Sequence, residues 1–341
     1  MKKISLLIPV YNEEESLDAL YTALLPLLNN THKLLKGIKY EWEVILVDDG
    51  SSDHSFDKLK QLNVRDDRFK YVKLSRNFGK ENALLAGFDR VSGDAMIIMD
   101  ADLQHPVETI PEMITKWEEG YEDVYGQRLS RGKESIFRKF FTKIYYSLLN
   151  KSTRVDVLPN VGDFRLLDRK VIDAIRGLRE TQRYTKGLYC WVGFKKTGVD
   201  FQTADRVAGK THMSPGRLVN LALEGITSYT TAPLRIATIL GGIISVLAIC
   251  YMIYIVCKTL MYGEPIQGFP TLICTILFLG GCQLLALGII GEYIGKIYNE
   301  SKGRPAYIVA EESESATSKE ADTYQTDSMA NFTNNSNPVQ P

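Results

Sequence analysis

Two long apolar runs near the carboxyl end of the chain restrict its possible folds more than any other feature. They cover 236–257 and 269–291, and neither contains a charged residue. About 20 apolar residues suffice for a helix to cross the hydrocarbon layer of a membrane, and a charge at its centre would cost about 2.5–3.5 kcal/mol. The sequence therefore predicts two transmembrane helices joined by a short connector, and the alternative is a hairpin buried in a protein core.

Positive charges flank the two runs. Arg235 precedes the first run, and Lys296, Lys302 and Arg304 follow the second. Cytosolic loops of membrane proteins are enriched in Lys and Arg, so both ends of the pair are expected to face the cytosol. We expect a multi-pass protein of the inner or plasma membrane, with its large amino-terminal domain and both termini in the cytoplasm.

Upstream of these runs, short apolar segments alternate with segments of helical periodicity. Strands are expected at 4–10, 44–47, 71–74 and 95–99, with helices at 14–28 and 80–91. This alternation favours an α/β fold with a doubly wound, mostly parallel sheet. No GxGxxG follows the first strand, so a dinucleotide cofactor is not the expected ligand.

These patterns divide the chain into four parts. Residues 1–215 are expected to form the α/β domain, 216–232 a juxtamembrane amphipathic helix, 233–297 the two transmembrane helices and 298–341 a cytosolic tail. From about Glu311 the composition turns to Ser, Thr, Asn, Glu and Asp. Such a composition cannot build a core, which indicates that the tail is mostly disordered.

Two carboxylates follow the strand expected at 95–99. Asp100, Asp102 and Gln104 are spaced two apart, and in an extended chain such residues point the same way. Ligands of open α/β sheets bind beyond the carboxyl ends of the strands, where these oxygens would lie. Oxygen donors suit Mg²⁺ or Mn²⁺, so the three residues are candidate metal ligands. The alternative is an ordinary turn, since Asp-x-Asp is a common turn pair.

Several stretches of the chain resemble family 2 glycosyltransferases. They are ISLLIPVYNEEE, VILVDDGSSD, LSRNFGKENALLAGFDRVSGDAMIIMDADLQHP and NVGDFRLLDR. The closest resemblance, from about Ile4 to about Ile308, is to the bactoprenol-phosphate (undecaprenyl-phosphate) glucosyltransferases of the dolichol-phosphate-mannose-synthase-like group. It implies a Rossmann-like GT-A domain and the inverting transfer of a hexose, in the first place glucose from UDP-glucose, onto a polyprenyl phosphate.

The resemblance also implies a nucleotide-sugar site in the loops after the strands. The matching positions are Pro9, Tyr11, Glu13, Asp49 and Ser51, and Lys80 and Asp100 are further candidates to contact the same ligand. A tyrosine ring can stack on uracil, and a carboxylate can accept the imide N–H of that base. For Asp49 the alternative is a tight turn with Gly50, and for Lys80 a solvated surface position.

The catalytic positions implied by the resemblance are Asp102, Asp163, Arg206 and Lys210. Asp102 and its metal would stabilise the departing UDP, while Arg206 and Lys210 would bind the diphosphate from a loop that closes over it. Asp163 would orient the acceptor or act as a weak base, because a phosphate with a second pKa of about 6 is already largely ionised. The alternative for Asp163 is a helix cap or a turn.

The segment 126–146 combines basic residues with aromatic residues at helical spacing. This pattern is typical of a helix that lies on a membrane surface, and an ordinary surface helix is the alternative. Arg128 and Arg131 precede the expected helix, and they are candidates for binding the acceptor phosphate.

The overall charge gives no reason to expect nucleic acid as a partner, since Lys and Arg number 41 and so do Asp and Glu. The expected partners are a nucleotide sugar, a polyprenyl phosphate, the membrane and further copies of the chain in a homo-oligomer. Two alternatives stay open. One is a polyprenyl-phosphate transferase for another sugar, of the mannose or aminoarabinose type, and the other is a non-catalytic membrane scaffold that binds a nucleotide.

Overall fold

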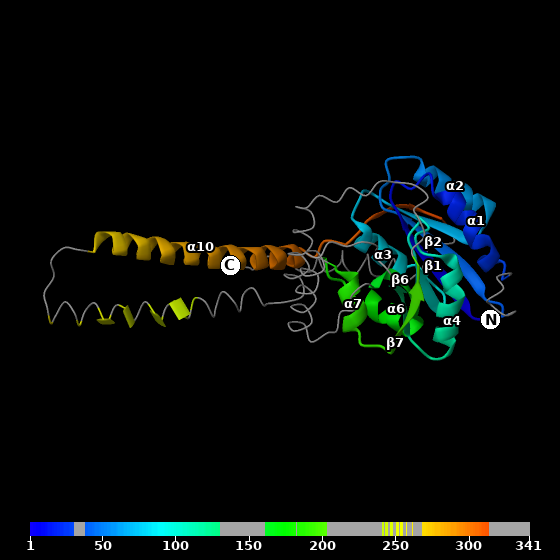
Figure 1. The fold of residues 1–341 in the computed structure, drawn as a ribbon. Coiled ribbons are helices and arrows are strands. Elements are labelled where there is room, and N and C mark those ends of the chain that lie inside the picture. Colours follow the sequence, from blue (N-terminus) through cyan, green and yellow to red (C-terminus); the bar gives the residue numbers. More distant parts are fainter. Residues whose placement is uncertain are drawn as a thin grey trace, which may run out of the picture. The chain divides into compact units, whose positions relative to one another are not determined.

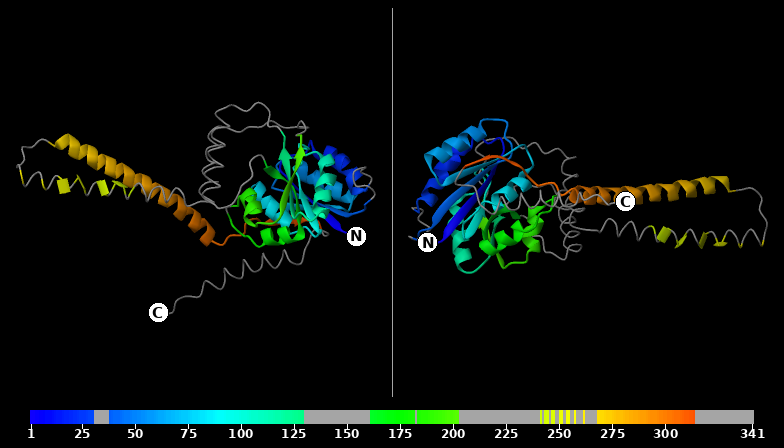
Figure 2. Two further views of the ribbon diagram at one scale, coloured as in Figure 1. Left: turned by 60° about the horizontal axis from the view of Figure 1, so that its bottom comes forward. Right: turned by 180° about the vertical axis from the view of Figure 1, so that it is seen from behind.

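The computed structural model describes residues 1–30, 38–129, 161–181, 183–202 and 268–313, together with single positions between 241 and 261. These residues belong to two compact units. The first unit contains the described residues up to 202 and the segment 303–313, and the second contains the others. Figure 1 and Figure 2 show the chain as a ribbon from three directions.

The first unit is built around an eight-stranded sheet with the strand order β7-β5-β6-β4-β1-β2-β3-β8. The strands are β1 (Lys3–Val10), β2 (Glu41–Asp48), β3 (Phe69–Leu74), β4 (Ala95–Ile98), β5 (Asp123–Arg128), β6 (Val161–Asp168), β7 (Lys196–Phe201) and β8 (Val309–Glu312). Strands β1 to β4 run parallel to one another and β5 runs parallel to β7, whereas β6 and β8 are antiparallel to their neighbours. The predicted α/β fold with a mostly parallel sheet is confirmed, and the four expected strands correspond to β1 through β4.

Helices cover both faces of this sheet (Figure 1). One face carries α1 (Leu17–Leu28), α2 (Ser55–Arg65) and α4 (Ile110–Glu118), which follows the short 3-10 helix η2 (Val107–Thr109). The other carries α3 (Lys80–Phe88), α6 (Arg169–Arg176) and α7 (Thr185–Trp191). Successive strand residues point to opposite faces, so Leu6 and Ile8 join the first core and Leu7 joins the second. Burial on both faces explains why these strands read as nearly continuous apolar runs.

The carboxyl ends of β1, β2 and β4 meet at one edge of the sheet because these strands are parallel. Strand β6 runs the other way, with Ile98 of β4 opposite Arg165 and Ala95 opposite Asp168. The start of β6, which carries Asp163, therefore lies at the same edge as the end of β4. This reversed strand places a carboxylate from a distant part of the sequence beside the loops that follow β1, β2 and β4.

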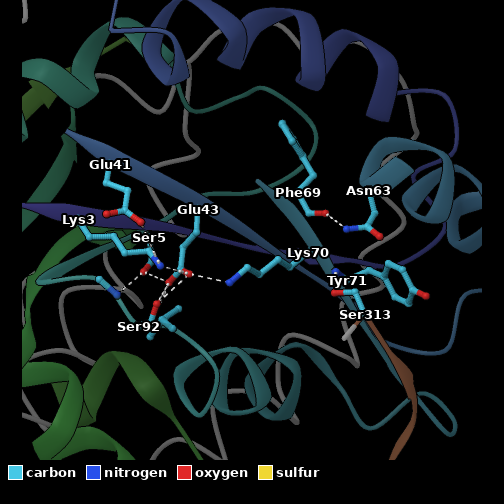
Figure 3. Close-up of polar contacts among 12 residues, drawn as sticks. Lys3, Ser5, Glu41, Glu43, Asn63, Phe69, Lys70, Tyr71, Ser92 and Ser313 are labelled. Atoms are coloured by element: carbon cyan, nitrogen blue, oxygen red, sulfur yellow. Dashed lines mark hydrogen bonds and ion pairs between the residues drawn. The ribbon is translucent and has the colours of Figure 1, made fainter. Parts of the chain in front are cut away.

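The chain returns to the sheet after the second unit. Strand β8 pairs with β3, which would otherwise be an edge strand. The Ser313 N–H donates to the Tyr71 carbonyl at 3.0 Å, and the Tyr71 N–H donates to Ser313 Oγ at 3.3 Å (Figure 3). Glu311 and Glu312 thus belong to a strand, although the composition predicts a disordered tail from about Glu311. The first unit contains 303–313 in addition to the described part of 1–215.

Buried polar contacts join this returning segment to the end of α3. The Tyr307 hydroxyl donates to Asp89 at 2.6 Å and accepts a hydrogen bond from Arg90 at 3.2 Å. Arg90 also donates to Glu312 at 2.6 Å, and Arg179 donates to both carboxylate oxygens of Asp89 at 2.8 Å each. Because Asp89 and Arg90 directly follow α3, the returning segment fixes the carboxyl end of that helix.

Glu43 lies toward the amino-terminal ends of β1 and β2, in a cluster of polar side chains (Figure 3). Its carboxylate accepts hydrogen bonds from Ser5 Oγ at 2.6 Å and the Ser92 N–H at 2.7 Å, and pairs with Lys3 at 3.0 Å and Lys70 at 3.1 Å. Burial opposes ionisation, but the bonds from Ser5 and Ser92 and the two lysines lower the pKa of Glu43 from 4.5 to about 2. The carboxylate is fully paired, so its role is structural.

The stability of the first unit is expected to depend on the ionisation of Glu43. A carboxyl whose pKa is lower in the folded state contributes stability above its unfolded pKa, and this contribution is lost as the pH falls through the folded value. The loss is expected between pH 4.5 and about 2 and amounts to about 3 kcal/mol of unfolding free energy. Glu43→Gln should destabilise the protein by a similar amount at pH 7, measured by urea unfolding, and flatten this pH dependence.

Glu41→Gln is the matched control for that variant. Glu41 lies on the same strand, but its side chain is 59% exposed. Its ion pair with the Lys3 ammonium is long at 3.8 Å. Its replacement should change the unfolding free energy by less than about 0.5 kcal/mol. Equal losses in the two variants would contradict a special role for the buried carboxylate.

The second unit contains one long helix, α10 (Phe269–Ser301, 33 residues). Its part Phe278–Ser301 is long and apolar enough to cross a membrane by length and composition, with a mean hydropathy of 1.4. The helix includes the second expected span, 269–291, and extends beyond it. Most of the first expected span, 236–257, and the whole expected juxtamembrane helix, 216–232, lie outside the described residues.

Candidate active site

Polar contacts tie the loop after β1 to the loop after β2. The Asn12 N–H donates to Ser51 Oγ at 3.0 Å, and the Ser52 N–H donates to Asn12 Oδ1 at 2.8 Å. Asn12 has a φ of 55°, a left-handed conformation that asparagine adopts more readily than most residues. The neighbouring Tyr11 is 48% exposed, so its ring is available to stack on a planar ligand.

The other two expected residues of the first loop are half-buried. Pro9 is the second-last residue of β1, and Glu13 follows the Asn12 turn. The Glu13 carboxylate accepts a hydrogen bond from Ser16 Oγ at 2.8 Å, and the Glu13 N–H donates to Ser55 Oγ at 2.8 Å. These contacts fix the loop, and a contact of either residue with a nucleotide stays a prediction.

Asp49 is 3% exposed, and its carboxylate holds the turn that precedes α3. One oxygen accepts the Phe78 N–H at 2.7 Å and the other accepts the Gly79 N–H at 2.9 Å. Burial raises the pKa of Asp49, although the two backbone N–H groups oppose this. Gly50 has a φ of 69°, and a Cβ there would lie 2.5 Å from the carbonyl carbon of Arg76. Asp49 thus positions the start of α3, and its contact with a nucleotide stays a prediction.

The chain turns immediately after β4, in the segment that carries the paired carboxylates. Asp102 Oδ1 accepts the Gln104 N–H at 3.1 Å, and Leu103 between them has a φ of 58°. A non-glycine residue in this conformation costs about 1–3 kcal/mol, and such strain is concentrated at functional sites. The turn expected as the alternative is thus present, and Asp100, Asp102 and Gln104 do not lie on one extended chain.

His105 is a site residue that the sequence analysis missed. It is 2% exposed, stacks on Phe164 with ring centroids 4.7 Å apart, and accepts the Asp100 N–H on Nδ1 at 3.1 Å. Burial lowers the pKa of His105, and the cations of Lys80 and Arg128 lower it further despite the opposing charge of Asp100. A neutral ring with its proton on Nε2 fits these contacts. The only feature of the sequence that could have indicated His105 as a site residue is its position three residues after Asp102.

Lys80 connects the end of β4 to the start of β6. Its ammonium lies 2.6 Å from Asp100 Oδ1 and 3.0 Å from Asp163 Oδ2. The side chains of Lys80 and Asp100 are 42% and 32% exposed, whereas that of Asp163 is 9% exposed. The second oxygen of Asp163 is buried and has no hydrogen-bond partner among the described residues. The structure thus joins three predicted site residues in one ion-pair cluster.

The cluster keeps both carboxylates ionised. Burial opposes ionisation of Asp163, but Lys80, Lys186 and Arg165 bring the pKa of Asp163 down to about 2. For Asp100, burial is likewise outweighed, chiefly by Lys80, and its pKa is lowered. A carboxylate with so low a pKa is a weak base, so this geometry suits Asp163 for orienting charge more than for accepting a proton.

Arg128 lies at the end of β5, opposite Phe201 of β7, and is close enough to His105 to affect the pKa of that ring. It therefore lies on the side of the domain that carries His105. The other three predicted cations, Arg131, Arg206 and Lys210, lie outside the described residues.

Comparison with known proteins identifies the family. Residues 5–176 match glycosyl transferase family 2, and residues 232–297 match the GtrB C-terminal hairpin. The chain belongs to glycosyltransferase family 2. This family 2 glycosyltransferase is 44% identical over 309 residues to the uncharacterized glycosyltransferase sll0501 of Synechocystis, a match that covers 91% of this chain and 95% of that protein.

A second relative of this family 2 glycosyltransferase is the bactoprenol glucosyl transferase of Shigella phage SfV. The two are 42% identical over 311 residues, covering 91% of this chain and 99% of the phage protein. Among solved structures, the mannosyltransferase PcManGT from Pyrobaculum calidifontis, in complex with GDP-Man and Mn²⁺, aligns over 96% of this chain and 84% of that chain. The identity there is 13% and the TM-score 0.42.

The residues of this family 2 glycosyltransferase fit a divalent metal that binds together with a phosphate ligand. Within the described ranges, no group of three or more His, Cys, Asp and Glu side chains forms a metal site by itself. Mg²⁺, however, is usually held by one or two carboxylates together with substrate phosphates. Asp100 and Asp102 are the candidates for these carboxylates, and Asp100 already attracts one cation, the Lys80 ammonium at 2.6 Å.

Proposed function

We propose that this protein transfers glucose from UDP-glucose to undecaprenyl phosphate or a related polyprenyl phosphate, with inversion at the sugar carbon. The observation that carries this proposal is the 42% identity to a bactoprenol glucosyl transferase over 91% of the chain. That match extends through both the family 2 region and the hairpin region. The hairpin gives a reason for a lipid acceptor, because a soluble acceptor would require no membrane anchor.

In this proposal the nucleotide sugar binds at the carboxyl ends of β1, β2 and β4. Tyr11 stacks on the base, Glu13 and Ser51 contact the nucleoside, and Asp49 keeps the adjoining loop in place. Mg²⁺ or Mn²⁺ held by Asp100, Asp102 and Gln104 would neutralise the negative charge that develops on the departing diphosphate. Arg206 and Lys210 are proposed to bind the same oxygens from the loop that precedes the hairpin.

The acceptor phosphate is proposed to approach from the side of Asp163 and Arg128. A phosphate monoester is largely ionised at neutral pH, so it can attack the sugar carbon without losing a proton to the protein. The low pKa of Asp163 supports an orienting role over that of a base. Arg128 and Arg131 would hold the phosphate by charge-assisted hydrogen bonds while the isoprenoid chain stays in the bilayer.

We also propose that two transmembrane helices anchor the protein, with the catalytic domain and both termini on the cytosolic side. In this proposal the protein forms a homo-oligomer. The apolar part of α10 and the match to a hairpin family support membrane association. Reporter fusions at Gly263 and after Ser313 should report opposite sides of the membrane, and the same side for both would exclude the hairpin topology.

A donor screen tests the choice of sugar. Purified full-length protein in detergent should incorporate label from UDP-glucose into polyprenyl phosphate, and incorporate at least about tenfold less from GDP-mannose or a UDP-aminoarabinose derivative. Preference for one of the latter donors would replace glucose in this proposal but keep the reaction class. Binding of UDP without transfer from any donor would favour the non-catalytic scaffold.

A further inference from the structure

The Lys80 ammonium lies where a cation at Asp100 would be held. It is 2.6 Å from Asp100 Oδ1, and its second partner, Asp163 Oδ2, is 3.0 Å away on another strand. With 42% of its side chain exposed, Lys80 lies at the surface of the site, where a ligand can reach it. One monovalent cation thus links a proposed metal ligand to the carboxylate on the acceptor side.

The backbone that carries Lys80 is fixed independently of this ion pair. Asp49 accepts the N–H groups of Phe78 and Gly79, directly before Lys80, and Glu81 accepts the Thr185 N–H at 2.9 Å. The lysine side chain beyond Cα is a flexible stem with a point charge at its end. The ammonium can therefore exchange partners while α3 stays in place.

The two partners of Lys80 differ in what they can do without it. The Asp100 side chain is about one-third exposed, so a divalent metal could reach its carboxylate. Its other oxygen, Oδ2, lies 4.0 Å from Nε2 of His105. Asp163 is 9% exposed, and its other oxygen has no hydrogen-bond partner among the described residues. A buried carboxylate that lost its cation would be strongly destabilised, so Lys80 has more reason to stay with Asp163 than with Asp100.

We propose that Lys80 is a positioning residue that competes with the divalent metal for Asp100. In the nucleotide-free protein its ammonium neutralises Asp100 and weakens metal binding, because two cations at one carboxylate repel each other. When the metal arrives with the anionic diphosphate, Lys80 leaves Asp100 and remains with Asp163. Binding of the metal and the diphosphate thereby changes the charge around Asp163, where the acceptor phosphate is proposed to approach. This inference rests on the proposed metal site at Asp100 and Asp102.

The test measures Mn²⁺ binding to full-length protein in detergent without nucleotide, by the electron paramagnetic resonance signal of free Mn²⁺. Lys80→Met should bind Mn²⁺ at least about tenfold more tightly than the wild type, since the competing charge is gone. Lys116→Met is the matched control: Lys116 forms a surface pair with Glu119 at 2.9 Å, and its loss changes the net charge equally. The control should bind Mn²⁺ as the wild type does.

Unchanged or weaker Mn²⁺ binding by Lys80→Met would overturn the competition. The same titrations with UDP separate this failure from failure of the metal site. Wild-type protein that binds Mn²⁺ with UDP retains the metal site, whatever the Lys80 variant does. Wild-type protein that binds no Mn²⁺ even with UDP overturns both proposals.

Asp163→Asn provides a second measurement in case Lys80→Met fails to fold. Asparagine has nearly the same volume but offers no charge to receive the displaced ammonium, so Mn²⁺ should bind several-fold more weakly than in the wild type. Equal or tighter Mn²⁺ binding by Asp163→Asn alone would overturn the inference.

Discussion

Replacing Asp102 by asparagine is expected to lower the rate of sugar transfer on the order of 10³-fold, the size seen when one group that stabilises developing charge is removed. Asparagine retains an oxygen that can accept the Gln104 N–H, which Asp102 now accepts at 3.1 Å, so the turn at Leu103 should persist. The loss should therefore appear in turnover and in Mn²⁺ binding with UDP, while the thermal unfolding midpoint stays close to that of the wild type.

Asp67→Asn is the control for this experiment. Asp67 is an exposed aspartate in the turn between α2 and β3, and the same chemical change there should leave transfer unchanged. Turnover of Asp102→Asn at the wild-type rate in the presence of a chelator would exclude the proposed metal-assisted role of Asp102.

Ending the chain after Lys302 is expected to lower the free energy of unfolding of the catalytic unit by about 3–5 kcal/mol, the usual cost of removing one partner of a buried ion pair. The deletion removes Glu312 and Tyr307, both of which contact Arg90, whose side chain is 3% exposed. It also uncovers β3, because β8 would be absent. Urea unfolding followed by tryptophan fluorescence measures the effect.

A chain that ends after Ser313 is the matched control. It retains β8 and the contacts of Tyr307 and Glu312, so its unfolding free energy should equal that of the full chain. If the chain ending after Lys302 were as stable as the one ending after Ser313, the returning segment would not be an integral part of the fold.

The parallel part of the fold was predictable because burial on both faces leaves a strong signal. Strands β1, β2 and β4 each contain an uninterrupted apolar run of at least four residues, and each is followed by polar residues where the chain leaves the sheet. Strand β8, in contrast, is the short segment Val309–Glu312, half of it glutamate. Such a segment cannot be distinguished from a tail by composition, because its stability comes from pairing with β3 and from the buried contacts of Tyr307.

The candidate site was predictable as a list of residues but not as an arrangement. An apolar run has the same pattern whether its strand runs parallel or antiparallel, so the sequence gives no direction for β6. Only the antiparallel pairing with β4 brings Asp163 to Lys80. The turn at Leu103 was expected only as the alternative, since the spacing of Asp100 and Asp102 is equally compatible with an extended chain.

The central claim is that a lipid phosphate accepts the sugar, and the most direct measurement is where labelled sugar goes. Full-length protein should be incubated with radiolabelled UDP-glucose, Mg²⁺ and polyprenyl phosphate, and the products separated into organic and aqueous phases. The account predicts label in the organic phase that mild acid releases, as expected for a glycosyl phosphate. With Asp102→Asn, this organic-phase label should be lost. Label that remains in the aqueous phase, on a protein or a soluble glycan, would contradict the claim.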